Sequence, residues 1–172
     1  MDKINTRVWE QIRIKDIAWF VGLMAVVAVI PHYVHNQFVT GPIVNATLFI
    51  AVVVLGAGNA ILIGLIPSVV ALVSGLLPVP LAPMVPFIMI SNAILIIVFS
   101  YFRKVNFWGG IAGATLFKYA FLYLTSTIVV GLISNQNIAA KAAATMLAWP
   151  QIVTALAGGV IAFGILKIIN KN

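Results

Sequence analysis

Long apolar segments separated by short polar or proline-rich stretches make up most of this chain. A helix that crosses a bilayer needs about 20 apolar residues, and fewer where neighbouring helices shield it. By that criterion the sequence predicts an all-α membrane protein, a bundle of six transmembrane helices, in which residues 1–172 form a single transmembrane domain. A polar leader precedes the first helix at about residues 1–15, and the six spans lie at about residues 17–34, 43–55, 60–77, 85–102, 107–133 and 142–169.

Polar residues, glycines and prolines mark the expected ends of these helices. Residues 35–42 predict the first loop, and residues 56–59 break the chain between the second and third spans. Pro67 predicts a kink inside the third span, because proline removes a helix hydrogen bond. The segment 78–86 contains four prolines and predicts a short, stiff, partly buried loop.

The charged residues predict the orientation of the bundle. Only 8% of the residues are charged and 63% are hydrophobic, which excludes an ordinary soluble domain. The positive-inside rule then places both the N-terminus and the C-terminus in the cytoplasm and leaves only Lys141 outside. The basic residues on the cytoplasmic side are Lys3, Arg7, Arg13, Lys15, Arg103, Lys104, Lys167 and Lys171.

Because these basic residues flank apolar segments rather than alternate with aromatic ones, the net charge of +7 does not predict a nucleic-acid partner. No cleavable signal peptide is expected, since the first apolar stretch ends without a small-x-small site. The chain has no cysteine, which excludes disulfides and thiolate chemistry.

Lys118 is the basic residue that orientation does not explain, because it lies inside the fifth span and no acidic residue follows Asp16. A charge at this depth costs about 3 kcal/mol on insertion scales, so it usually faces a cavity, a partner or a ligand. We interpret Lys118 as an anion-binding group; a neutral or snorkelling lysine is the alternative. At 3.6 residues per turn, several polar residues fall on the same side of the helix, where hydrogen bonds between helices are the other explanation. These residues are Thr115, Tyr119, Tyr123, Thr125 and Ser126.

Two amides lie at a similar depth, Asn92 in the fourth span and Gln151 in the sixth. Each alone is as well explained by contacts between helices, but together with Lys118 they predict one pocket that opens outward. We expect Tyr123 or Trp149 to stack on an apolar part of the ligand, and the loops 35–42 and 78–86 to act as lids. His32 and His35 are one turn apart, but without a third ligand nearby we expect an interfacial pair and no metal site.

Small residues form a stripe on each of two spans and predict close approach of another helix. Ala155, Gly158, Gly159 and Ala162 form the stripe on the sixth span, where we expect contacts inside the bundle. On the first span, internal contacts and an external protein partner remain equally open. That stripe comprises Ala18, Gly22, Ala25 and Val29.

The segments NAILIGLIPS at 59–68 and MVPFIMISNA at 84–93 resemble the third and fourth helices of a known family. This family is the substrate-binding S component of energy-coupling factor (ECF) transporters, and the resemblance covers roughly residues 15–170. It implies a vitamin or metal bound in an outer pocket between helices four to six, capped by the first and third outer loops. It also implies docking on a transmembrane T component through an Ala-xxx-Ala motif on helix one, with two ATPases as further partners.

In this sequence the docking motif matches Ala18 and Gly22, with glycine in place of the second alanine. Nickel and cobalt members begin Met-His, whereas this chain begins Met1-Asp2, so we expect no metal substrate. The resulting hypothesis is an S component in the bacterial cytoplasmic membrane that captures a small, vitamin-like, anionic micronutrient and holds no cofactor.

Three alternatives remain. A membrane-embedded enzyme is disfavoured because the acidic residues are only Asp2, Glu10 and Asp16. A stand-alone secondary transporter would need an intramembrane carboxylate or an internal repeat. A structural or assembly subunit of a larger membrane complex would explain the small-residue stripes but not the outward polar cluster. Nucleotide-binding motifs are absent from the sequence, so ATP would be used by partner subunits.

Overall fold

The computed structural model describes residues 2–132, 140–143, 147 and 149–169, with side chains from Ile14 onward, and this described part contains helices but no strand. A short helical stretch covers residues 140–143. The helices are α1 (Asp2–Tyr33), α2 (Gln37–Leu55), α3 (Ala57–Val73), the 3₁₀ helix η1 (Val79–Met84), α4 (Val85–Phe102), α5 (Phe107–Leu132) and α7 (Pro150–Ile169).

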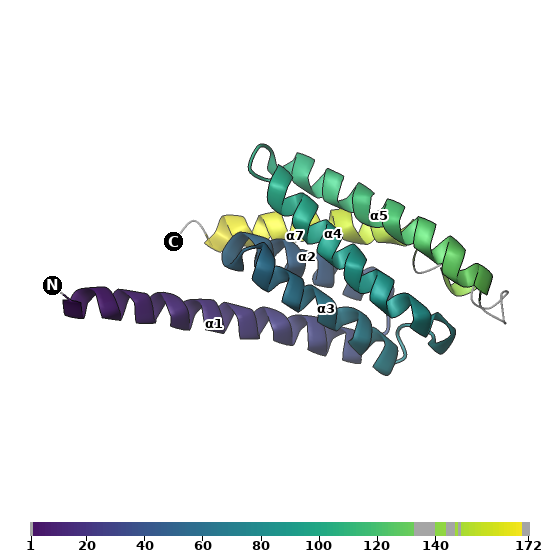
Figure 1. Cartoon of the computed structure of the whole chain (residues 1–172), viewed down its shortest axis with the longest axis horizontal. Helices are drawn as coiled ribbons and strands as arrows, with labels where there is room; N and C mark the ends of the chain where they lie inside the picture. The colour runs from purple at the N-terminus through teal and green to yellow at the C-terminus, as the bar shows by residue number, and fades with distance from the viewer. Residues whose placement is uncertain (1, 133–139, 144–146, 148, 170–172) are drawn as a thin grey trace.

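The helices run back and forth as an antiparallel bundle (Figure 1). The start of α1, the α4–α5 turn and the end of α7 lie toward one end of the bundle, and the α1–α2 and α3–η1 corners lie toward the other. In the part of the chain that the structure describes, five helices are long and apolar enough to cross a membrane, whereas α3 has 17 residues and is shorter. The chain is therefore an all-α protein whose helices suit a lipid bilayer.

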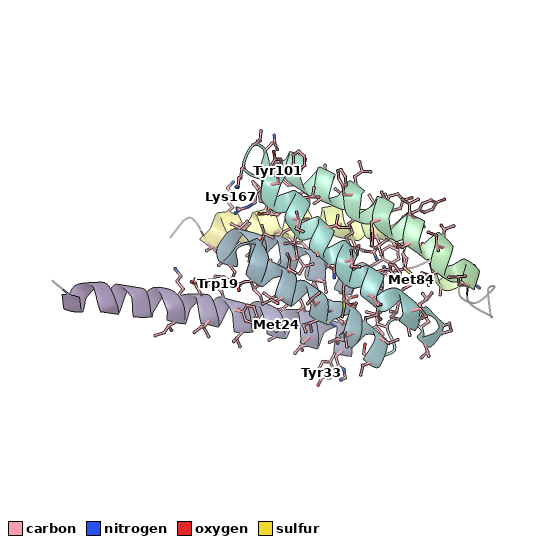
Figure 2. The ribbon with its side chains drawn as sticks, in the orientation of Figure 1. Trp19, Met24, Tyr33, Met84, Tyr101 and Lys167 are labelled. Carbon is pink, nitrogen blue, oxygen red and sulfur yellow. The ribbon has the colours of Figure 1, made fainter. Side chains whose placement is uncertain are left out.

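Helix α2 is the centre of the bundle, because it contacts α1, α3, α4 and α7. Its side chains Leu48 and Phe49 are inaccessible to solvent and belong to the larger of two hydrophobic clusters. In that cluster the rings of Phe49 and Phe99 are 4.7 Å apart. The smaller cluster contains Leu81 and Met84 of η1, and Figure 2 shows Met84 within the half of the bundle opposite Lys167.

Glycines bring α7 against α2 and α5. A Cβ atom at Gly158 would lie 2.8 Å from the backbone nitrogen of Ala46 and from the carbonyl oxygen of Pro42, and one at Gly159 would lie 2.6 Å from Ile111. The small-residue stripe of α7 is thus used inside the bundle, as expected. The stripe of α1 is different, because Ala18, Gly22, Ala25 and Val29 are all exposed.

The first expected loop is largely helical, because α2 begins at Gln37 rather than at residue 43. Asn36 explains the difference: its side-chain oxygen accepts a hydrogen bond of 2.9 Å from the backbone N–H of Phe38 and caps the helix. Pro42 then lies within the early turns of α2 and does not end it. Helix α1 likewise extends through the leader from Asp2.

Three other expected boundaries also differ. Helix α3 ends at Val73 instead of residue 77, because Gly75 has a φ of 79° and turns the chain in the left-handed region. The segment 78–86 forms η1 and the start of α4 rather than an irregular loop. Helix α7 begins at Pro150 and not at 142, since proline is favoured at the first helical position. The boundaries of α4 match the expected ones, and α5 ends within one residue of the expected end.

The two glycine stripes predict opposite responses to the same substitution. Gly158→Ala places a methyl group against α2 backbone atoms and should destabilise the fold by about 1–3 kcal/mol. Gly22→Ala is the matched control, because no atom lies within 4 Å of the added carbon and the gain in helix propensity is the same. Thermal unfolding in detergent, followed by size-exclusion chromatography, would measure both, and equal midpoints would contradict the α2–α7 contact.

Candidate functional site

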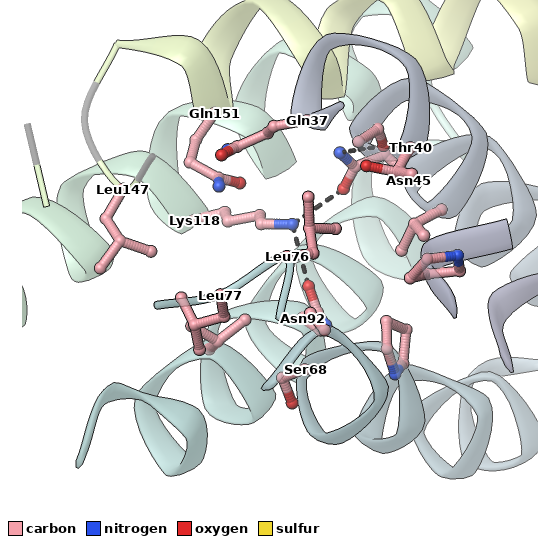
Figure 3. A pocket seen from close by; sticks show the side chains of 16 residues that line it. Gln37, Thr40, Asn45, Ser68, Leu76, Leu77, Asn92, Lys118, Leu147 and Gln151 are labelled. Atoms are coloured by element: carbon pink, nitrogen blue, oxygen red, sulfur yellow. Dashed lines mark hydrogen bonds between the residues drawn. The ribbon is translucent and has the colours of Figure 1, made fainter. Parts of the chain in front are cut away.

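The side chain of Lys118 is buried in the middle of the bundle, with 3% of its surface exposed. Its Nζ atom donates hydrogen bonds to Oδ1 of Asn45 on α2, at 2.8 Å, and to Oδ1 of Asn92 on α4, at 2.9 Å (Figure 3). Both acceptors are neutral amides. Neither partner could therefore neutralise the charge of a protonated Lys118.

Backbone carbonyls fix how the two amides are turned. Nδ2 of Asn45 donates to the carbonyl oxygen of Gly41 at 2.9 Å, and Nδ2 of Asn92 donates to that of Gly64 at 2.9 Å. With each amide nitrogen held in this way, each amide oxygen faces Lys118. The resulting hydrogen-bond chain joins α2, α5, α4 and α3. A protonated lysine has three N–H donors, so in that state one would remain for a ligand after the two asparagines are satisfied.

Lys118 lines a cavity of about 100 Å³ that lies between the two hydrophobic clusters. In Figure 3, Gln37 and Gln151 lie on one side of the Lys118 side chain and Leu77 on the other. The remaining lining residues are Pro31, Thr40, Gly41, Val44, Asn45, Pro67, Ser68, Ala71, Leu76, Ile88, Asn92 and Leu147. One cation, four amides and two hydroxyls thus face a cavity whose other walls are aliphatic, apart from Gly41.

The structure brings three of the expected site residues together, since Lys118, Asn92 and Gln151 all line this cavity. Tyr123 and Trp149 are not among the lining residues, and they are 52% and 58% exposed. The structure therefore does not bring Tyr123 and Trp149 together with Lys118 at this cavity. Tyr123 follows Lys118 by five residues, which turns it well away around the helix. Trp149 lies in the turn before α7 and faces Phe38, with their ring centres 5.8 Å apart.

Asn45 is the site residue that sequence reasoning missed. It is the only amide in the apolar run 43–55, and a polar residue at such depth is a signal of the same kind as Asn92. It was missed because the sequence predicts that α2 begins at residue 43, which would put Asn45 near the end of the helix. In the structure α2 begins at Gln37, so Asn45 lies two turns inside it.

The segments expected to act as lids are held in place. Residues 37–42 belong to α2, and η1 buries Leu81 and Met84 completely. His35 Nε2 lies 2.8 Å from the carbonyl oxygen of Ser74, and the Ser74 hydroxyl donates to the carbonyl of Pro31 at 3.0 Å. These hydrogen bonds tie the α1–α2 corner to the α3–η1 corner. His32 instead lies edge-on to Tyr33, with ring centres 4.9 Å apart.

Comparison with protein-family models, with curated proteins and with solved structures finds no match. What the site can do must therefore be argued from its own chemistry. An ammonium held away from water attracts an anion far more strongly than one in solvent does. Within the described residues, no three His, Asp or Glu side chains come together in a metal-binding cluster. The arrangement is suited to binding a small anion.

A double-mutant cycle on Lys118 and Asn92 would test the hydrogen-bond chain. Asn92→Ala or Lys118→Met each leaves a buried polar group without its partner and should destabilise the fold by about 1–3 kcal/mol. The double variant should lose less than the sum, with a coupling of about 0.5–3 kcal/mol. Asn59→Ala is the control, because Asn59 is exposed and bonds only to the carbonyl of Leu55. Additive losses in detergent unfolding would show that Lys118 and Asn92 do not act as a pair.

Proposed function

We propose that this chain is the substrate-binding S component of an ECF-type importer, which captures a small anionic organic nutrient from outside the cell. The observation that carries the proposal is the buried Lys118 ammonium, held only by amide oxygens at the wall of a cavity. A stand-alone structural subunit would have no need of such a group, and its partner amides are placed to keep it in position.

The charge of Lys118 is the reason for choosing an anion. Taking an ammonium out of water costs several kcal/mol, and hydrogen bonds to neutral groups compensate only part of that. The sequence has no acidic residue after Asp16, so none of the helices beyond α1 supplies a counter-ion. A bound carboxylate would supply the missing charge and accept the third N–H. Lys118 would then be the main anchor, with Asn45 and Asn92 positioning it and Gln151 bonding to the ligand.

The distribution of basic residues supports a cavity that opens to the outside. Arg103 and Lys104 lie at the α4–α5 turn, and Figure 2 shows Lys167 at the same end of the bundle. Under the positive-inside rule this end is cytoplasmic. We count α3, at the short limit for a membrane helix, as a span in addition to the five longer helices, and the resulting even number of spans places both termini in the cytoplasm of a bacterial cell. The cavity then lies in the outer half of the bundle.

The exposed stripe on α1 supports a partner in the membrane. Ala18, Gly22 and Ala25 face away from the bundle, and no atom lies within 4 Å of a Cβ atom built at Gly22. Small residues on a lipid-facing surface let another helix approach closely. The proposed occupant is the transmembrane T component, which with two ATPases would drive release of the nutrient into the cell.

Lys118→Ala tests the substrate site. The protein should be purified from cells grown in rich medium and examined by native mass spectrometry for a bound small molecule. Lys118→Ala should reduce affinity for that molecule at least about tenfold, which corresponds to the loss of one charge-assisted contact. Lys104→Ala removes a basic residue at the other end and should have no effect. An unchanged affinity in Lys118→Ala would show that Lys118 does not anchor the molecule, and the absence of any bound molecule would favour the structural subunit.

Gly22→Leu tests the partner surface. Co-expressed T component and ATPases from the same genome should co-purify with the wild-type chain and be lost with Gly22→Leu, because the large side chain separates the two helices. Gly164→Leu is the control, since Gly164 is also exposed and has no atom within 4 Å. Equal recovery of the complex with both variants would contradict docking at the α1 stripe.

A further inference from the structure

We infer that the ligand is a short aliphatic monocarboxylate, of about six non-hydrogen atoms or fewer, rather than a vitamin that contains a ring. This inference rests on the proposed function and narrows it to one class of substrate. Three properties of the cavity carry it: its volume, the chemistry of its walls and the number of cations that line it.

The volume favours a small ligand. The cavity measures about 100 Å³. An apolar protein cavity of about 150 Å³ is known to hold benzene, which has six non-hydrogen atoms, and a single water needs about 10–15 Å³. The cavity around Lys118 is thus large enough for several atoms, and a short acid such as propionate or butyrate suits it better than a bicyclic vitamin does.

The walls select an aliphatic ligand. Leu76, Leu77, Ile88, Leu147 and Val44 supply branched aliphatic surface, and no aromatic residue is among the sixteen that line the cavity. A planar ring gains from stacking on another ring or from edge-to-face contact, and this cavity provides neither. Tyr123 and Trp149, the aromatic residues that could have filled that role, lie outside the lining.

The charge of the site selects a monocarboxylate. Among the described residues that line the cavity, Lys118 is the only charged one, so a second carboxylate would have no counter-ion among them. The amides of Gln37 and Gln151 lie on one side of Lys118, where they can hydrogen-bond to an oxygen of the ligand. A single carboxylate on a short carbon chain therefore satisfies the ammonium and covers the aliphatic wall.

The walls are also tethered, which limits how far the cavity can widen. Asn45 and Asn92 are bonded to the backbone of α2 and α3, at Gly41 and Gly64. The His35–Ser74 and Ser74–Pro31 hydrogen bonds join two corners of the chain that both contribute lining residues. These bonds hold the parts of the wall that they join at fixed positions.

Isothermal titration calorimetry on the full chain in detergent, at constant ionic strength, tests the inference. The probes are sodium propionate and butyrate, with propionamide as the neutral control and benzoate, nicotinate and biotin as ring-containing acids. Propionate and butyrate should bind at least about tenfold more tightly than propionamide or benzoate. Lys118→Met should abolish this binding, and Lys104→Ala should leave it unchanged.

Leu77→Ala provides a test that does not depend on the stability of Lys118 variants. Removing the Leu77 side chain enlarges the cavity beside Lys118 (Figure 3) and should improve binding of hexanoate relative to propionate at least about tenfold. An unchanged preference for short acids in this variant would show that the cavity wall does not set ligand size.

The outcomes separate the two proposals. Tighter binding of nicotinate or biotin than of propionate, lost in Lys118→Met, would overturn the short-chain inference and leave an anion-binding S component standing. Failure of every acid to bind in a Lys118-dependent way would overturn the inference and contradict the anion site on which the proposed function depends.

Discussion

The hydrogen bonds from Lys118 to Asn45 and Asn92 are the interaction on which the middle of this structure depends. An ammonium in the centre of an apolar bundle is tolerable only if its N–H groups are satisfied, and the helices are placed so that two amide oxygens do this. Each amide turns its oxygen toward Lys118 because its nitrogen donates a hydrogen bond to a backbone carbonyl oxygen. The position of one amine is thus specified by four helices at once. The cavity lies beside this amine, and Lys118, Asn45 and Asn92 form part of its wall.

The remainder of the bundle is arranged around that polar centre. One hydrophobic cluster, built on α2 and the rings of Phe49 and Phe99, fills the end nearer the start of α1. The other, built on η1 and α5, closes the opposite end. Glycines in α7 allow it to lie directly on the backbone of α2, so the central helix is covered without large side chains. The same residue type on α1 remains exposed, which is why identical substitutions at the two glycines differ in their consequences.

Much of this organisation could be predicted from the sequence. Apolar length identifies the membrane helices, and the ends of α4 and α5 agree to within a residue. The grouping of Lys118, Asn92 and Gln151 was also predictable, because polar residues at one depth have few other partners in a membrane. Helix caps were harder to predict. The sequence predicts that Asn36 lies in a loop, whereas its side chain caps the start of α2. The direction of Tyr123 could have been derived, since its offset of five residues from Lys118 places it about 140° away around the helix. The volume of the cavity and the tethering of its walls depend on atoms from six helices, which no local sequence pattern encodes.

Helix α1 is longer than the hydrocarbon core of a bilayer is thick. Its 32 residues rise about 48 Å at 1.5 Å each, whereas the hydrocarbon core is about 30 Å thick. No glycine or proline interrupts it before Gly22, so the part that extends beyond the lipid is continuous with the part that carries the exposed stripe. If α1 tilted where its stripe contacts a neighbouring helix, the N-terminal end of α1 would be displaced, because the helix is continuous. Movement within the membrane would in this way be amplified at its surface.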